Sequence, residues 1–340
     1  MKNWNEILGN KRVRDVLARA VSTKRLHHAY LFTGPVGVGK HTTAHALAAS
    51  LNCDQRHPQE FTPNCGQCRT CRLTAERQHP DLFFVEPPNR VITIDQIRQL
   101  QKACVSAPYE ANYRVVLIDE CHAMKEEAAN ALLKTLEEPP DQMILVLITD
   151  QPHRLLDTII SRCQRVRFGA LDRQEIARVL PEFIDEPVDA AVLEVAAGYG
   201  EGSLGRSVDI LQSGMLAERA DLVRKISQVE ANAPRAWLEL AEELSDETQD
   251  FEYRIDVLTV FFRDMMLTKR AEPTRVVNSD LQELVEEMAQ KFSVQAILTT
   301  LDALMSARYR LAGHVNKQLL AEDLVDRLRD PDSRALDRPS

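Results

Sequence analysis

The chain has 340 residues, of which 44% are hydrophobic and 27% are charged, and its formal net charge is −9. This length exceeds one ordinary globular core, so two or three domains are expected. The acidic balance excludes a uniformly basic surface, and any contact with nucleic acid therefore requires a local basic region. No apolar stretch reaches the ~18 residues of a membrane span, and the N-terminus lacks the apolar segment of a secretory signal, so we expect a cytoplasmic protein.

Short apolar runs alternate with helical patterns over residues 1–168. The runs that we interpret as strands are 29–33, 82–85, 115–119, 144–149 and 165–168. Each is largely apolar, as is typical of strands buried on both faces of a parallel sheet. Between them, residues 126–137 carry one apolar helical stripe, which ends before two prolines. The alternation predicts an α/β domain with a five-stranded parallel sheet and helices on both faces.

The strand signal fades after residue 168. Residues 169–213 contain short amphipathic segments interrupted by Pro and Gly, and we interpret them as a small helical lid domain. Residues 214–330 carry apolar side chains at three- and four-residue spacings, which predicts an all-helical third domain. The tail 331–340 is predicted to be disordered.

A glycine-rich segment, GPVGVGKHT at 34–42, follows the first strand and opens a helical pattern. It nearly matches the phosphate-binding motif G-x-x-x-x-G-K-[ST] in its required context. Gly34, Gly37 and Gly39 would let backbone amides face a phosphate, and Lys40 would add a charge at the β- and γ-phosphates. The alternative is a glycine-rich turn that binds no ligand.

The residue after the lysine departs from this motif, because it is His41 where a Ser or Thr hydroxyl coordinates Mg²⁺. Thr42 follows, but neighbouring helical positions point about 100° apart, so it does not simply substitute. Mg²⁺ prefers oxygen ligands, which makes imidazole a poor replacement. The sequence therefore predicts that ATP with Mg²⁺ can be bound, though weakly because of His41, and leaves open whether the chain is itself an enzyme.

Adjacent carboxylates, Asp119 and Glu120, end the strand at 115–119. Asp119 would hold Mg²⁺ through water and Glu120 would orient the attacking water. The alternative is that both acids merely favour the start of the next helix. Thr149 ends the following strand, where a polar side chain could sense the γ-phosphate, although many strands end in Thr.

Four of the seven cysteines, Cys53, Cys65, Cys68 and Cys71, lie within 19 residues. The two-residue gaps allow consecutive thiolates to reach one ion, and four sulfurs suit tetrahedral Zn²⁺. We predict a structural zinc knuckle at 53–71 in a reducing compartment. The alternatives are four unligated thiols and an iron–sulfur cluster.

Three segments carry a family resemblance: HAYLFTGP at 28–35, NALLKTLEEPP at 130–140 and TIISRC at 158–163. They resemble the AAA+ clamp-loader family, which includes the bacterial delta-prime, gamma and tau subunits of DNA polymerase III and, more distantly, replication factor C. The segment 316–324 is similar to the end of the family's collar domain. The resemblance implies an AAA+ nucleotide-binding domain at 1–168, a lid at 169–213 and a collar for oligomerisation at 214–330, and similar subunits carry a cysteine module.

The resemblance also implies roles for two arginines. Arg162, in the Ser-Arg-Cys segment, would be an arginine finger that reaches the neighbouring subunit's ATP and stabilises charge there. Arg206, in the segment 202–206, would be a second sensor that approaches the γ-phosphate of its own subunit. The alternatives are a surface arginine at 162, and a helix cap or surface ion pair at 206.

As a clamp-loader subunit, the chain would be of the delta-prime type, since its length and His41 fit that type. It would act mainly as a stator, a subunit that serves its neighbour's ATP site and does little hydrolysis itself. Its partners would be the gamma/tau and delta subunits, the sliding clamp and, through the assembly, primer–template DNA. No membrane contact is expected. Polymerase activity would belong only to the assembled holoenzyme. The alternatives are an ATP-hydrolysing subunit of the gamma/tau type and, from another class, a zinc-knuckle nucleic-acid-binding protein.

Overall fold

A computed structural model describes residues 3–57, 60–104, 106–229, 233–245, 251–270, 276–311 and 316–329. The chain divides into two compact units. The first comprises residues 1–176 with 202–205, and the second comprises 177–201 with 206–340. The tail for which we predicted disorder, 331–340, lies outside the described residues.

A five-stranded parallel sheet forms the centre of the first unit, in the order β2-β3-β4-β1-β5. Its strands are β1 (Ala29–Thr33), β2 (Leu82–Val85), β3 (Arg114–Ile118), β4 (Met143–Thr149) and β5 (Gln164–Arg167). All five predicted strands are present. The last three begin one residue earlier than predicted, because backbone pairing extends beyond the apolar run, as where Arg114 pairs with Met143.

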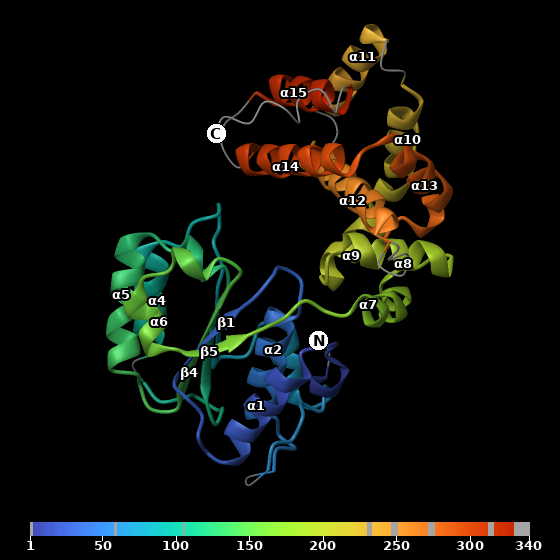
Figure 1. Cartoon of the computed structure of the whole chain (residues 1–340). Coiled ribbons are helices and arrows are strands. Elements are labelled where there is room, and N and C mark those ends of the chain that lie inside the picture. Colours follow the sequence, from blue (N-terminus) through green and yellow to red (C-terminus); the bar gives the residue numbers. More distant parts are fainter. Residues whose placement is uncertain are drawn as a thin grey trace. The chain divides into compact units, whose positions relative to one another are not determined.

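Helices cover both faces of this sheet, which confirms the predicted α/β class (Figure 1). The helices of the first unit are α1 (Lys11–Ser22), α2 (Lys40–Asn52), α3 (Arg69–Ala75), α4 (Ile94–Ala103), α5 (Glu126–Glu137) and α6 (Asp157–Arg162). In β4, Leu145 and Leu147 pack towards α4, α5 and α6, whereas Ile144, Val146 and Ile148 pack towards α1 and α2. Successive strand residues point to opposite faces, so a strand that is buried on both faces has no polar alternation.

The second unit is built from helices in its described residues. They are α8 (Ala190–Tyr199), α9 (Leu204–Gln212), α10 (Met215–Gln228), α11 (Pro234–Ser245), α12 (Phe251–Lys269), α13 (Gln282–Lys291), α14 (Val294–Leu311) and α15 (Lys317–Arg329), while α7 (Arg173–Val179) and the start of α9 cross the boundary between the units. The long helix α12 packs against α13 and α14, and α11 packs against α15. A separate lid at 169–213 stays a prediction. None of the described helices combines the length and apolar character that a bilayer crossing needs.

Candidate nucleotide and metal sites

The phosphate-loop segment connects β1 to α2, and its glycines adopt backbone conformations that other residues rarely adopt. Gly34, Gly37 and Gly39 all have positive φ, at 144°, 73° and 93°. A Cβ atom at Gly34 would lie 2.4 Å from the carbonyl oxygen of Phe168, and one at Gly37 would lie 2.0 Å from Oγ of Ser203. Both close approaches require glycine. The loop therefore packs tightly against the residue that follows β5 and against the segment that contains Ser203.

Lys40 begins α2 and is buried, with 7% of its surface exposed. Its Nζ atom donates hydrogen bonds to the carbonyl oxygens of Gly34 and Pro35, at 2.7 and 2.5 Å. Burial lowers the pKa of this ammonium group, and the carboxylates of Asp150 and Asp119 partly oppose the effect. The lysine is thus held inside its own loop, beside the carboxylates at the ends of β3 and β4.

His41 faces the acidic end of β3, where the motif would place a hydroxyl. Its Nε2 atom lies 3.9 Å from Oδ2 of Asp119, and it shares a hydrogen bond of 3.1 Å with Nε2 of His45. The guanidinium of Arg77 lies 3.4 Å from Nε2 of His41. Burial lowers the pKa of His41, although Asp119 opposes this, and burial together with His41 lowers the pKa of His45 to about 3. Both imidazoles are therefore neutral near pH 7. Thr42 lies half-buried on the next position of α2.

Asp119 and Glu120 follow β3 directly, rather than ending it. Asp119 is partly exposed, and its Oδ1 atom accepts a hydrogen bond from the backbone N–H of Glu120. Glu120 is exposed and has a left-handed backbone, with φ of 44°. The sharp turn starts the segment that contains His122.

Thr149 ends β4 and is almost fully buried, with 1% of its surface exposed. Its hydroxyl accepts from the backbone N–H of Gln151 at 2.9 Å and is hydrogen-bonded to Nδ1 of His122 at 3.0 Å. The same His122 nitrogen lies 3.5 Å from Oδ1 of Asp150. The candidate γ-phosphate sensor is thus hydrogen-bonded to a histidine of the segment that follows β3.

Arg162 ends α6 and is partly exposed. It donates to Oε1 of Glu137 at 2.7 Å and to the carbonyl oxygen of Thr158 at 2.9 Å. Because 36% of the Arg162 side chain and 51% of the Glu137 side chain are exposed, water screens this ion pair. The guanidinium is therefore accessible, and only a weak contact holds it.

Arg206, the predicted second sensor, lies on α9 in the second unit. It forms ion pairs with Glu201 and with Asp256 of α12, and Asp256 also pairs with Arg308 at 2.9 Å. Burial raises the pKa of Asp256, and both arginines oppose this. Its sensor role stays a prediction.

The four cysteines of the predicted knuckle converge. Their Sγ atoms all lie within 4.8 Å of one another, with Cys53 and Cys68 3.9 Å apart and Cys65 and Cys71 4.0 Å apart. Four sulfurs at about 2.3 Å from a tetrahedral Zn²⁺ ion lie about 3.8 Å from each other, so the donor set fits zinc. Burial raises the pKa of Cys71, whereas backbone amides outweigh burial at Cys65 and lower its pKa to about 7.

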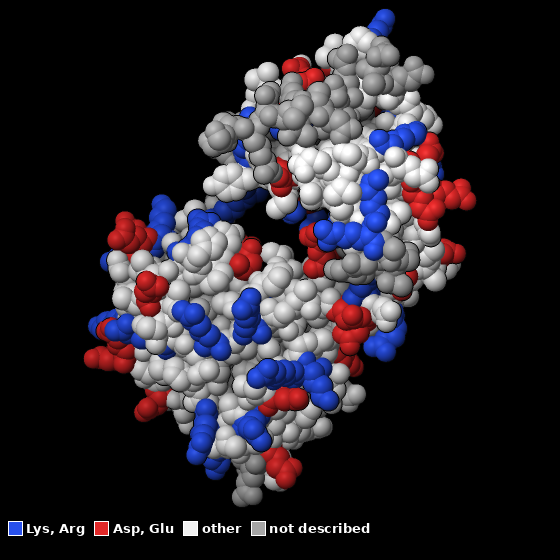
Figure 2. Space-filling model, viewed as in Figure 1, with Lys and Arg blue, Asp and Glu red and all other residues white. Residues whose placement is uncertain are grey.

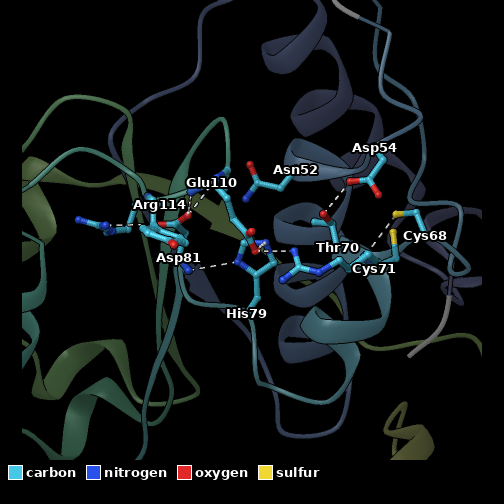
Figure 3. Close-up of polar contacts among 12 residues, drawn as sticks. Asn52, Asp54, Cys68, Thr70, Cys71, His79, Asp81, Glu110 and Arg114 are labelled. Carbon is cyan, nitrogen blue, oxygen red and sulfur yellow. Dashed lines mark hydrogen bonds and ion pairs between the residues drawn. The ribbon is translucent and has the colours of Figure 1, made fainter.

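Polar contacts lie within this knuckle and between it and the segment that precedes β3 (Figure 3). Thr70 of α3 donates to Asp54 at 2.7 Å, and Arg69 pairs with Glu110 at 2.7 Å. The side chain of Asn52 exchanges two hydrogen bonds with the backbone of Tyr113. The knuckle is therefore anchored to the segment that precedes β3.

A buried ion pair lies behind this anchor. Arg114 donates to Oδ1 of Asp81 at 3.0 Å, and the carboxylate also accepts from the backbone amides of residues 109, 110 and 111 (Figure 3). Burial alone would raise the pKa of Asp81, but these hydrogen bonds outweigh it and lower the pKa. The carboxylate is thus charged and fully partnered.

Comparison with known proteins decides the family. A sequence profile described as DNA polymerase III, delta subunit, matches residues 9–172, and a profile for the C-terminal part of that subunit matches 213–330. The chain is 31% identical to DNA polymerase III subunit delta' of Bacillus subtilis (strain 168) over 333 residues, which cover 97% of this chain and 98% of the relative. The chain belongs to the delta-prime family of DNA polymerase III subunits. This confirms the clamp-loader resemblance of its motifs.

Two further relatives of this delta-prime family member are a second delta' subunit and a tau subunit. DNA polymerase III subunit delta' of Pseudomonas aeruginosa is 32% identical over 312 residues, which cover 88% of this chain and 90% of the relative. DNA polymerase III subunit tau of Bacillus subtilis is 29% identical over 326 residues, which cover 89% of this chain and 57% of the relative. The similarity to delta' relatives thus extends over nearly their whole length.

Several neighbours of the candidate nucleotide site in this delta-prime family member were not predicted from the sequence. His45, Arg77 and Glu86 all gather around His41, and Ser203 closes over Gly37. The spacing of His41 and His45 was a usable signal, because helix residues four apart share a face. Arg77, Glu86 and Ser203 contact residues that are far from them in the sequence, so no local sequence pattern predicts these contacts.

Proposed function

We propose that this delta-prime family member acts in the clamp loader mainly as a stator, which supplies Arg162 to the ATP site of the neighbouring subunit. The observation that carries the proposal is the position of His41, 3.9 Å from Asp119. An imidazole there replaces the hydroxyl that would coordinate Mg²⁺, so the chain's own hydrolysis is weak. The chemistry that the chain contributes is then the charge of its accessible arginine finger.

The partners are the gamma/tau and delta subunits, the sliding clamp and, through the assembly, primer–template DNA. An exposed apolar stripe on α14 supports a collar contact with equivalent helical domains. Val294, Leu298, Met305 and Tyr309 lie on one face of that helix and are 49%, 41%, 64% and 84% exposed. Polymerase activity belongs to the holoenzyme, and the working location is the cytoplasm.

We also propose that the four-cysteine knuckle holds structural Zn²⁺. Cys53 follows α2, and Cys68 and Cys71 lie at the start of α3, so these thiolates would tie the two helices together. Bound zinc supplies metal–sulfur bonds and takes no part in a reaction, because four protein sulfurs leave no open position.

The arginine finger can be tested in an assembled loader in which only the subunit next to this chain keeps a working phosphate loop. Arg162→Ala is expected to lower ATP turnover by about 10³-fold, since arginine fingers contribute 10³ or more to such reactions. Arg165→Ala, at an exposed position of β5, is the matched control and is expected to leave turnover unchanged. Unchanged turnover in the Arg162 variant would contradict the proposal.

A second candidate is an ATP-hydrolysing subunit of the gamma/tau type. Lys40, Asp119 and Thr149 favour it, because they lie at the carboxyl ends of β1, β3 and β4, where parallel sheets bind ligands. A zinc-knuckle nucleic-acid-binding protein is disfavoured, because Arg69 and Arg77 are paired with Glu110 and Glu86. Figure 2 shows basic and acidic side chains interspersed over the face in view.

A further inference from the structure

Two histidines on α2 form a pair through the same ring nitrogen. His41 and His45 are four residues apart and share a helix face, and their Nε2 atoms lie 3.1 Å apart. Two imidazoles on one tetrahedral ion, each at about 2.0–2.1 Å, have nitrogens about 3.3 Å apart. The hydrogen-bonded separation of the two nitrogens is therefore close to the separation of two nitrogens on one ion.

Two carboxylates approach His41 from other elements. Asp119 follows β3 and Glu86 follows β2, and the donor atoms of His41, Glu86 and Asp119 all lie within 4.8 Å of one another. Three separate elements thus deliver nitrogen and oxygen donors to one place. Nitrogen and oxygen donors together suit Zn²⁺, Co²⁺, Ni²⁺ or Mn²⁺, whereas Mg²⁺ requires mostly oxygen.

The orientation of His45 is fixed by packing. Only 7% of this residue is exposed, and its ring stacks on Phe84 with 4.7 Å between centroids and 21° between planes. Ligands held in place by neighbouring side chains lose little freedom on binding, which strengthens a metal site. His45 has no part in phosphate binding or in the arginine finger, so this arrangement is unexplained by the clamp-loader role.

One cation competes for the same place. Arg77 donates to Oε1 of Glu86 at 2.6 Å, and its guanidinium also lies 3.4 Å from Nε2 of His41. The side chain of Arg77 is 43% exposed and can rotate into solvent. Removal of this positive charge would therefore favour a divalent ion at the cluster.

We propose that His41, Asp119 and Glu86 form a binding site for one divalent first-row transition-metal ion, with the adjacent His45 as a further nitrogen donor and Arg77 as an internal competitor. The ion would join the start of α2 to the ends of β2 and β3, and so fix the phosphate loop. This site is distinct from the four cysteines. It goes beyond the stator role and does not depend on Arg162, so the failure of either proposal leaves the other intact.

The test uses the full chain with its cysteine-bound zinc retained, titrated with Co²⁺ by calorimetry and visible absorption. Zn²⁺ binds such sites more tightly than Co²⁺, so the cysteines keep zinc. We expect one equivalent of Co²⁺ to bind with weak d–d bands and without thiolate charge-transfer absorption, and excess Mg²⁺ not to displace it. Absence of saturable binding, a thiolate spectrum or displacement by Mg²⁺ would each overturn the proposal.

Variants identify the ligands. His41→Ala and His45→Gln are each expected to weaken Co²⁺ binding by about 10-fold or more, as loss of metal-site residues does. His153→Ala, at an exposed histidine, is the matched control, and Arg77→Gln is expected to tighten binding. Asp119→Asn is a second ligand variant in case His45→Gln fails to fold. Unchanged affinity in the His41 variant and in a folded His45 or Asp119 variant would overturn the assignment.

Discussion

Nε2 of His41 and Oδ2 of Asp119 lie 3.9 Å apart, so an imidazole faces the carboxylate that would otherwise hold Mg²⁺ through water. The phosphate loop around this pair keeps its glycine backbone and its buried lysine. The candidate site thus keeps the loop backbone and the lysine of a phosphate-binding motif, and it lacks the hydroxyl that would coordinate Mg²⁺. This combination fits a subunit that serves its neighbour's ATP.

The cysteine knuckle provides a prediction about metal content. Cys68→Ser removes one of four converging sulfurs, so zinc is expected to fall well below one equivalent and the knuckle to lose stability. Elemental analysis and thermal unfolding measure the two effects. Cys104→Ser is the control, because this buried cysteine lies outside the cluster and its loss should leave zinc at one equivalent. Full zinc content in the Cys68 variant would refute the four-thiolate site.

The contact between Arg162 and Glu137 is expected to contribute little to stability. Both side chains are substantially exposed, and such pairs contribute about 0–1 kcal/mol. Glu137→Gln should therefore change the free energy of unfolding by less than about 1 kcal/mol, as urea titration would show. Since the finger must leave Glu137 to reach a phosphate, ATP turnover of the assembled loader should be equal or higher. A large loss of turnover would mean that Glu137 positions the arginine.

The Asp81–Arg114 pair is expected to be important for stability. Asp81 is fully buried and Arg114 is 5% exposed, and removing one partner of such a pair costs about 3–5 kcal/mol. Asp81→Asn should lower the free energy of unfolding by that amount at pH 7. Asp141→Asn, at an exposed carboxylate, is the control and should cost under about 0.5 kcal/mol.

The same pair predicts the direction of a pH effect. The folded-state pKa of Asp81 is below its ordinary value of 3.8, so its contribution is fully present above that value. It is lost as the pH falls below 3.8 through the lower folded-state pKa. Urea unfolding between pH 7 and pH 3 should therefore show a steeper loss in the natural chain than in Asp81→Asn. Parallel curves would contradict this assignment.

The sequence located the sheet well, because strands that are buried on both faces appear as continuous apolar runs. It also located the phosphate loop and the cysteines, whose residues lie close together along the chain. It did not locate the cluster around His41, since Arg77 and Glu86 reach that histidine through folding. One partner of Arg206 is Asp256, 50 residues away on another helix, which no spacing rule could predict.

The most direct test of the account is the affinity of the isolated chain for Mg-ATP, measured by titration calorimetry for the natural sequence and for His41→Thr. The account predicts binding by the natural chain that is much weaker than micromolar, and tighter binding by the variant, because the hydroxyl oxygen of the variant completes the Mg²⁺ site. Micromolar affinity in the natural chain would contradict the stator role and return the ATP-hydrolysing role to first place.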